Sequence, residues 1–167
     1  MKKLFVVRHA KSSWKMAEVA DVDRPLKGRG VRDAYNTAEW LAEQGDMPEV
    51  LISSPATRAL HTALIFAQRM NIPFSDIIIK ESIYGADTKH LRQIVASINN
   101  EYSSVMIFGH NPTITHFVNH CIEHHIDHVP TTGVACLKFD VTSWAQIDQN
   151  ADLMFFDYPK KRVQKKD

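Results

Sequence analysis

The feature that most constrains this chain is a regular alternation of short apolar runs with segments of helical periodicity. The apolar runs have the length of strands and cover residues 4–7, 50–52, 77–79 and 105–108. Between them, apolar residues recur every three or four positions in residues 31–42, 59–67 and 91–98. Strands that alternate with helices predict an α/β fold, in which a mostly parallel sheet carries helices on both faces.

The ends of the helical segments are marked by residues that favour helix termini. Gly45 is typical of a helix end, and Ser54 followed by Pro55 is typical of the cap and first turn of the next helix. Asp87 or Thr88 can cap the third segment. A further helix is expected from Asn111-Pro112, followed by strands at residues 135–141 and 152–156. The expected sheet is mostly parallel, with room for one antiparallel strand at its edge.

The length of 167 residues fits one domain with a substantial core. No repeat, low-complexity tract or flexible linker divides the chain. We place the domain at residues 1–159 and interpret residues 160–167 as a basic C-terminal tail. The cations of this tail are Lys160, Lys161, Arg162, Lys165 and Lys166.

Charge is balanced, with 20 lysines and arginines against 19 acidic residues and a formal net charge of +1. Such a chain has no broad positive field, so neither nucleic acid nor a membrane is an expected partner. The N-terminus lacks the apolar stretch of a secretory signal, and a cytoplasmic protein is expected. Cys121 and Cys136 have neither Cys-x-x-Cys spacing nor the density of a disulfide framework, so we interpret both as buried residues.

Polar side chains with related chemistry follow all four apolar runs. Arg8 and His9 follow the first, Arg58 lies soon after the second, and Glu81 and His110 follow the third and fourth. Ligands of open α/β sheets bind beyond the carboxyl ends of the strands, where these residues would meet. Guanidinium groups match phosphate oxygens, helix N-termini favour anions, and a neutral imidazole can act as a nucleophile. The pattern therefore predicts a site for a phosphoryl group.

The segments around these residues resemble the histidine phosphatase superfamily. The resemblance is carried by VVRHAKSSW, SSPATRALHTA and FGHNP, in the order in which that family has its Arg-His-Gly, Ser-Pro-x-x-Arg and Gly-His segments. Ala10 replaces the glycine of the first segment and supplies no reacting group. The stretches DVDRPLKGRG, IYGAD, PTTGVACLKFD and DYPKK are similar to the small SixA-type phosphohistidine phosphatases. The resemblance implies a single-domain, three-layer sandwich like that of phosphoglycerate mutase.

The resemblance also implies a role for each site residue. His9 would be the nucleophile, and Arg8, Arg58 and His110 would hold the phosphoryl group. Glu81 is the candidate general acid, with an exposed carboxylate without catalytic role as the alternative. Arg24 would be an additional anion contact. The implied reaction is attack of His9 on phosphorus, followed by hydrolysis of a phosphohistidine intermediate, with no metal and no cofactor.

The interval between Arg58 and His110 has room for little more than one strand and one helix, so no insertion caps the site. An open pocket suits a phosphohistidine on a protein partner better than a small metabolite. The alternatives are a phosphatase for a small phosphate ester and a binding module for phosphorylated partners with little turnover.

Two other features of the sequence have competing interpretations. His116, His120 and His124 lie four residues apart and could bind a metal, although a polar helix face explains the same spacing. Trp14 fits equally well as a rim of the pocket or as a cover of the core.

Overall fold

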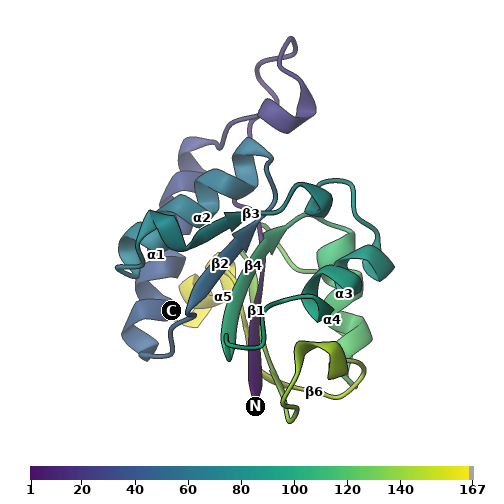
Figure 1. Cartoon of the computed structure of the whole chain (residues 1–167). Coiled ribbons are helices and arrows are strands. Elements are labelled where there is room, and N and C mark those ends of the chain that lie inside the picture. Colours follow the sequence, from purple (N-terminus) through teal and green to yellow (C-terminus); the bar gives the residue numbers. More distant parts are fainter. Residues whose placement is uncertain (166–167) are drawn as a thin grey trace.

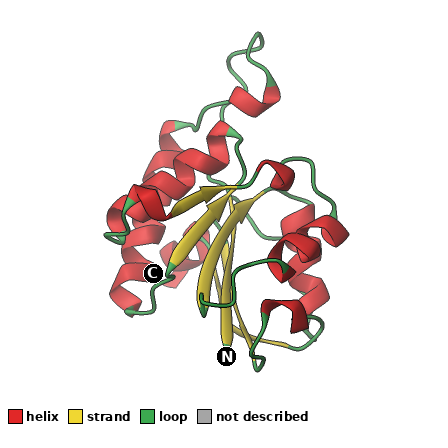
Figure 2. Cartoon of the chain, viewed as in Figure 1, coloured by secondary structure: helices red, strands yellow, loops and turns green. Residues whose placement is uncertain are grey.

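The computed structural model describes residues 1–165 and shows a six-stranded sheet between layers of helices (Figures 1 and 2). The strands are β1 (Lys2–Arg8), β2 (Val50–Ser53), β3 (Ile77–Ile79), β4 (Ser104–Gly109), β5 (Val134–Phe139) and β6 (Ala151–Asp157). The helices are α1 (Gly28–Gln44), α2 (Thr57–Arg69), α3 (Thr88–Ala96), α4 (Thr113–Cys121) and α5 (Pro159–Lys165). Short 3₁₀ helices are η1 (Asp21–Asp23), η2 (Phe74–Asp76), η3 (Glu81–Ile83) and η4 (Trp144–Gln146). All the strands expected from the sequence are confirmed.

The strand order is β3-β2-β4-β1-β5-β6. The first four strands are parallel, whereas β5 is antiparallel to both of its neighbours, β1 and β6. The mostly parallel sheet is therefore confirmed. Its antiparallel strand does not lie at the edge as expected but one position inside it, because β6 forms a hairpin-like pair with β5 and extends the sheet beyond it.

Two apolar clusters, one on each face of the sheet, form the core. Alternate residues of β1 separate between them: Phe5 and Val7 pack with α1 and α2, and Leu4 and Val6 pack with α3 and α4. This alternation follows from the two-residue period of a strand. In Figure 1, α1, α2 and α5 lie on one side of the sheet and α3 and α4 on the other. The three-layer architecture is confirmed.

Two of the predicted helix ends are confirmed, and the start of α2 differs from the sequence-based expectation. Gly45, with a φ of 77°, terminates α1 as predicted, and the Asp87 carboxylate caps α3 by accepting from the backbone N–H of His90 at 2.8 Å. The helix α2, however, begins at Thr57 with no side-chain cap. Ser54 lies in the turn before it, where its hydroxyl accepts from Ala56 N–H at 3.2 Å.

The basic segment after residue 159 continues the fold as helix α5. Arg162 forms an ion pair with Asp157 and donates to the hydroxyl of Thr37 on α1. Residues 160–165 are thus helical where a tail was expected, and this helix contacts α1. Lys166 and Asp167, which the interpretation as a tail included, lie outside the described residues. Within residues 1–165, no helix is both long and apolar enough to cross a membrane.

Candidate active site

The sheet topology brings the two predicted histidines together. β1 and β4 are adjacent and parallel, and Arg8 at the end of β1 pairs in register with Gly109 at the end of β4. His9 and His110 therefore follow two neighbouring strand ends, and their ring centroids lie 5.3 Å apart. The N–H of Thr132 holds the end of β1 by donating to the carbonyl oxygens of Arg8 and His9, at 3.1 and 3.2 Å.

A pocket of about 250 Å³ opens at this carboxyl edge of the sheet. It is lined by Arg8, His9, Lys11, Ser12, Trp14, Arg24, Arg58, His110, Asn111 and Thr131. All the residues predicted to bind the phosphoryl group are among them. Trp14 lies at the pocket and is 73% exposed, so it forms part of the rim and does not cover the core.

His9 is held in the form that a nucleophile requires. Its Nδ1 lies 2.7 Å from the carbonyl oxygen of Ala10, and since this oxygen can only accept, Nδ1 carries the hydrogen. The lone pair of a neutral ring is then on Nε2. Burial is the main cause that lowers the pKa of His9 to about 3, and the nearby His110, Arg58 and Arg8 lower it further. The imidazole is consequently neutral near pH 7.

His110 is also held neutral, with its pKa lowered to about 4 mainly by burial and then by the charge of Arg58. Its Nε2 lies 2.8 Å from the hydroxyl of Ser54. Its buried Nδ1 has no hydrogen-bond partner within the described residues, and the same holds for Nε of Arg8. Buried polar nitrogens without partners are costly. An oxyanion within reach would accept from Nε–H of Arg8, and from Nδ1 of His110 in the tautomer that carries its hydrogen there.

Arg58 is 7% exposed and directed by Asp21, a residue of η1. The guanidinium donates to the backbone oxygen of Asp21 at 2.7 Å and to its carboxylate at 3.1 Å. Thr62, one helical turn after Arg58, accepts from Ala10 N–H at 3.0 Å and donates to Arg58 O at 2.7 Å. The spacing of Arg58 and Thr62 therefore ties α2 to the backbone beside His9.

Arg24 lines the pocket, but its guanidinium is already engaged by the segment between β1 and α1. It donates to Ser12 Oγ at 2.5 Å and to Ser13 O at 3.2 Å, and it pairs with Asp21 at 2.9 Å. Its guanidinium carbon lies 3.2 Å from the centroid of the Trp14 ring. These contacts position the segment, which protrudes beyond the strand ends (Figure 1). A direct contact of Arg24 with an anion stays a prediction.

Glu81 is the one predicted site residue that does not line the pocket. It begins η3 after β3, its side chain is exposed, and it has no side-chain hydrogen bond or ion pair among the residues described. Its role as general acid stays a prediction.

Asp21 and Tyr84 are site residues that the sequence analysis did not single out. The hydroxyl of Tyr84 donates to the Asp21 carboxylate at 2.6 Å, and its ring packs edge-on against His110 with centroids 5.7 Å apart. The hydrogen bond from Tyr84, followed by those from Arg24 and Arg58, holds the pKa of Asp21 well below its usual range. Asp21 lies in the DVDRPLKGRG segment and Tyr84 in the IYGAD segment. Nothing in the sequence indicates that these two residues meet, because no spacing rule relates segments so far apart.

The histidine-rich helix face does not assemble a metal site. Over residues 1–165, no group of three or more His, Cys, Asp or Glu side chains is arranged to hold a metal ion. His120 instead contacts Asp148, with Nε2 2.8 Å from the carboxylate. The prediction for the cysteines is confirmed, because Cys121 and Cys136 are both free and buried.

Comparison with known proteins identifies the family. The model of the histidine phosphatase superfamily (branch 1) matches residues 4–85. An uncharacterized chloroplastic protein of Arabidopsis thaliana is 32% identical over 118 residues, which are 66% of this chain and 54% of that protein. The chain thus spans about half the length of this relative. Together with the fold and the site, these matches show that the chain belongs to the histidine phosphatase superfamily.

Similar solved structures indicate the branch of the superfamily to which the chain belongs. The SixA protein of Agrobacterium tumefaciens has 26% identity and a TM-score of 0.80, with 95% of this chain and 98% of that chain covered. The protein histidine phosphatase SixA complexed with tungstate has 21% identity and a TM-score of 0.82, with 96% and 99% covered. The chain is therefore a SixA-type member of the superfamily, and its fold is the one that the sequence resemblance implied.

Proposed function

We propose that this protein is a metal-independent phosphatase that removes the phosphoryl group from phosphohistidine on a partner protein. His9 would attack phosphorus through Nε2 as the P–N bond to the substrate imidazole breaks. The electron pair of that bond goes to the imidazole nitrogen, which takes a proton from solvent. Water then attacks the phosphoryl group on His9, which releases inorganic phosphate and restores the neutral imidazole.

The observation that carries this proposal is the absence of a carboxylate among the residues that line the described pocket. An alkoxide is a poor leaving group and needs a positioned acid, whereas an imidazole leaving from phosphorus needs less help. The pocket instead offers Arg8 and Arg58, which can stabilise the charge on the three equatorial oxygens of the transition state. The tungstate bound by the SixA relative is an oxyanion, which supports the same use of this pocket here.

The short connection between Arg58 and His110 supports a protein substrate. Apart from the rest of α2 and β4, this connection consists of η2, β3, η3 and α3. These elements leave the pocket without the enclosing cover that a small ligand usually has. A phosphorylated side chain on a protein surface can reach such a pocket.

The test is hydrolysis of a synthetic peptide that carries one phosphohistidine, in parallel with phosphoserine as a small alkyl phosphate. We expect kcat/KM to be at least tenfold higher for the peptide, with the rate unchanged by EDTA because the arginines supply the charge. A clear preference for phosphoserine would instead support a phosphatase for small esters. Binding without turnover of either compound would support a binding module.

A further inference from the structure

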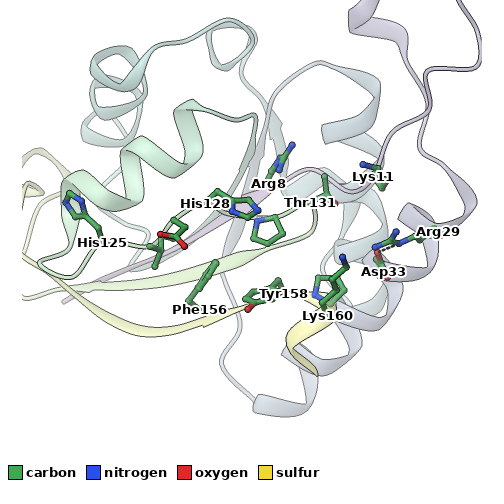
Figure 3. Close-up of a pocket in the computed structure, with 14 residues that line it drawn as sticks. Arg8, Lys11, Arg29, Asp33, His125, His128, Thr131, Phe156, Tyr158 and Lys160 are labelled. Carbon is green, nitrogen blue, oxygen red and sulfur yellow. Dashed lines mark ion pairs between the residues drawn. The ribbon is translucent and has the colours of Figure 1, made fainter. Parts of the chain in front are cut away.

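A second cavity adjoins the active-site pocket, and we call it the basic groove. Its volume is about 690 Å³, and it shares Arg8, Lys11 and Thr131 with the pocket. Its other lining residues are Arg29, Asp33, His125, Ile126, Asp127, His128, Pro130, Phe156, Tyr158, Pro159 and Lys160. They come from α1, the segment between α4 and β5, and the junction of β6 with α5 (Figure 3). The basic groove and the active-site pocket are therefore neighbouring cavities, with the three shared residues at their junction.

The charged residues of the basic groove leave an excess of positive charge. Arg29 and Asp33 offset each other as an ion pair at 3.7 Å, drawn as a dashed line in Figure 3. The side chains of Lys11 and Lys160 are exposed, and their ammonium groups form no ion pair or hydrogen bond in the part of the chain that the structure describes. Asp127 is the remaining acidic residue of the lining. The lining therefore has two unpaired ammonium groups and one remaining carboxylate, and Arg8 adds a further positive charge where the groove meets the pocket.

The remainder of the lining suits a polypeptide. The rings of Phe156 and Tyr158 lie 5.3 Å apart and are half-buried, so they offer an apolar surface for aliphatic parts of side chains. The exposed rings of His125 and His128 can exchange hydrogen bonds with polar groups. Figure 3 shows His128, Thr131 and Lys160 around one open space, with His125 at its far end.

We propose that the basic groove binds an acidic segment of the phosphorylated partner, next to the phosphohistidine. This inference rests on the proposed function. The pocket has room for the phosphoryl group and its imidazole, so the chain on either side of the phosphohistidine must pass over the rim. On the side of Arg8 and Thr131 that chain meets the groove, where unpaired lysines favour aspartate and glutamate side chains.

The test uses three synthetic peptides of equal length, each with one phosphohistidine, flanked by glutamates, by glutamines or by lysines. At low ionic strength we expect kcat/KM to be about tenfold higher for the glutamate-flanked peptide than for the glutamine-flanked one, and lowest with lysines. The preference should shrink as salt is raised, because the lysines of the groove are exposed.

The Lys160→Glu variant assigns the effect to the basic groove. Lys160 is exposed and lies outside the active-site pocket, so we expect the variant to lose the glutamate preference and keep the wild-type rate on p-nitrophenyl phosphate. The matched control is Lys89→Glu, a charge reversal at an exposed position on α3 in the opposite helix layer, which should keep the preference.

The outcomes distinguish failure of the acidic docking segment from failure of the proposed phosphatase activity. If all three peptides were hydrolysed equally fast, the acidic docking segment would be overturned while the phosphohistidine phosphatase stood. If Lys160→Glu and Lys89→Glu weakened the preference equally, the effect would be one of net charge and the basic groove would be excluded. If no peptide were hydrolysed while p-nitrophenyl phosphate was, the proposed function itself would fail, and the inference with it.

Discussion

His9 and His110 show how this fold keeps two imidazoles without charge at neutral pH. Both rings are surrounded by the sheet ends and by arginines, so a proton on either would be desolvated and repelled. A neutral His9 has a free lone pair for attack on phosphorus. The same burial that keeps His9 neutral therefore makes the folded state sensitive to acid.

The first prediction concerns this sensitivity. In the unfolded chain His9 binds a proton below pH 6.5, whereas in the folded protein its pKa is about 3. The stability that depends on neutral His9 is thus fully present above pH 6.5 and is lost progressively as pH falls toward 3. Between pH 7 and pH 5 the wild type should lose about 2 kcal/mol of unfolding free energy that His9→Gln keeps.

Urea denaturation at pH 7, 6 and 5 measures this difference. His124→Gln serves as the control and should follow the wild type, because the ring of His124 is exposed. Parallel stability curves for wild type and His9→Gln would show that His9 is not buried in its neutral form.

The second prediction concerns Glu81, which the sequence favoured as general acid. Because Glu81 is exposed outside the pocket and imidazole is an undemanding leaving group, Glu81→Gln should change kcat/KM on a phosphohistidine peptide by less than about threefold. If Glu81 is positioned to protonate the leaving group, Glu81→Gln should lower kcat/KM on phosphoserine selectively, by about 10²–10⁴-fold. An equally large loss on both substrates would contradict leaving-group protonation as the role of Glu81.

The sequence predicted the arginines and histidines that line the pocket but not the residues that hold them in place. Arg8, His9 and His110 could be found because each lies within two residues of the end of an apolar run, and strand ends in a parallel sheet share one edge. Asp21 and Tyr84 could not, because their contact joins the segment before α1 to the segment after η3 and depends on how both cross the site. Their partnership is a property of the folded chain.

At the scale of elements, helix α1 is held against the active-site backbone at Gly30. A Cβ on Gly30 would overlap the carbonyl oxygen of Lys11, which also accepts from Lys27 N–H at 2.8 Å. Lys11 lines both the pocket and the basic groove. The close approach of α1 to this backbone therefore sets the position of the segment that follows the nucleophile.

The third prediction uses this contact. Gly30→Ala should cost about 1–3 kcal/mol of unfolding free energy, because backbone has to move. It should also lower kcat/KM, since Lys11 moves with it. Gly28→Ala is the matched control on the same helix: its Cβ would meet only the flexible end of Arg32 at 3.6 Å, and alanine favours the helix. Thermal unfolding and kcat/KM of the two variants check this, and equal behaviour would contradict the role given to Gly30.

Most helices and strands were predictable from the sequence, but the start of α2 and the presence of helix α5 were not. The periodicity of residues 91–98 and the apolar run at 105–108 each admit one interpretation, and both elements formed as expected. Ser54 and Pro55 carried a helix-start signal, but the hydroxyl of Ser54 lies by His110 and the helix begins later. Helix α5 is stabilised by Arg162 with Asp157 and Thr37, and those contacts cannot be read from a run of lysines.

In the molecule as a whole, the proposed reaction and the proposed binding of the partner are assigned to one edge of the sheet. The pocket proposed to bind the phosphoryl group lies where β1, β2 and β4 end, and the basic groove lies next to it, toward α1 and the start of α5. The open edge follows from the short connection between Arg58 and His110. The proposed function therefore requires no opening movement for a protein substrate to reach the pocket.

In the proposed mechanism His9 carries the phosphoryl group during turnover, and rapid quenching of the reaction can detect this intermediate. Enzyme mixed with a ³²P-labelled phosphohistidine peptide is stopped with base within milliseconds, digested and analysed by mass spectrometry. We predict base-stable, acid-labile phosphate on His9, formed and lost at rates that account for kcat, and no label or turnover in His9→Ala. Release of phosphate at the full rate with His9 unlabelled, or turnover by His9→Ala within tenfold of wild type, would contradict the account.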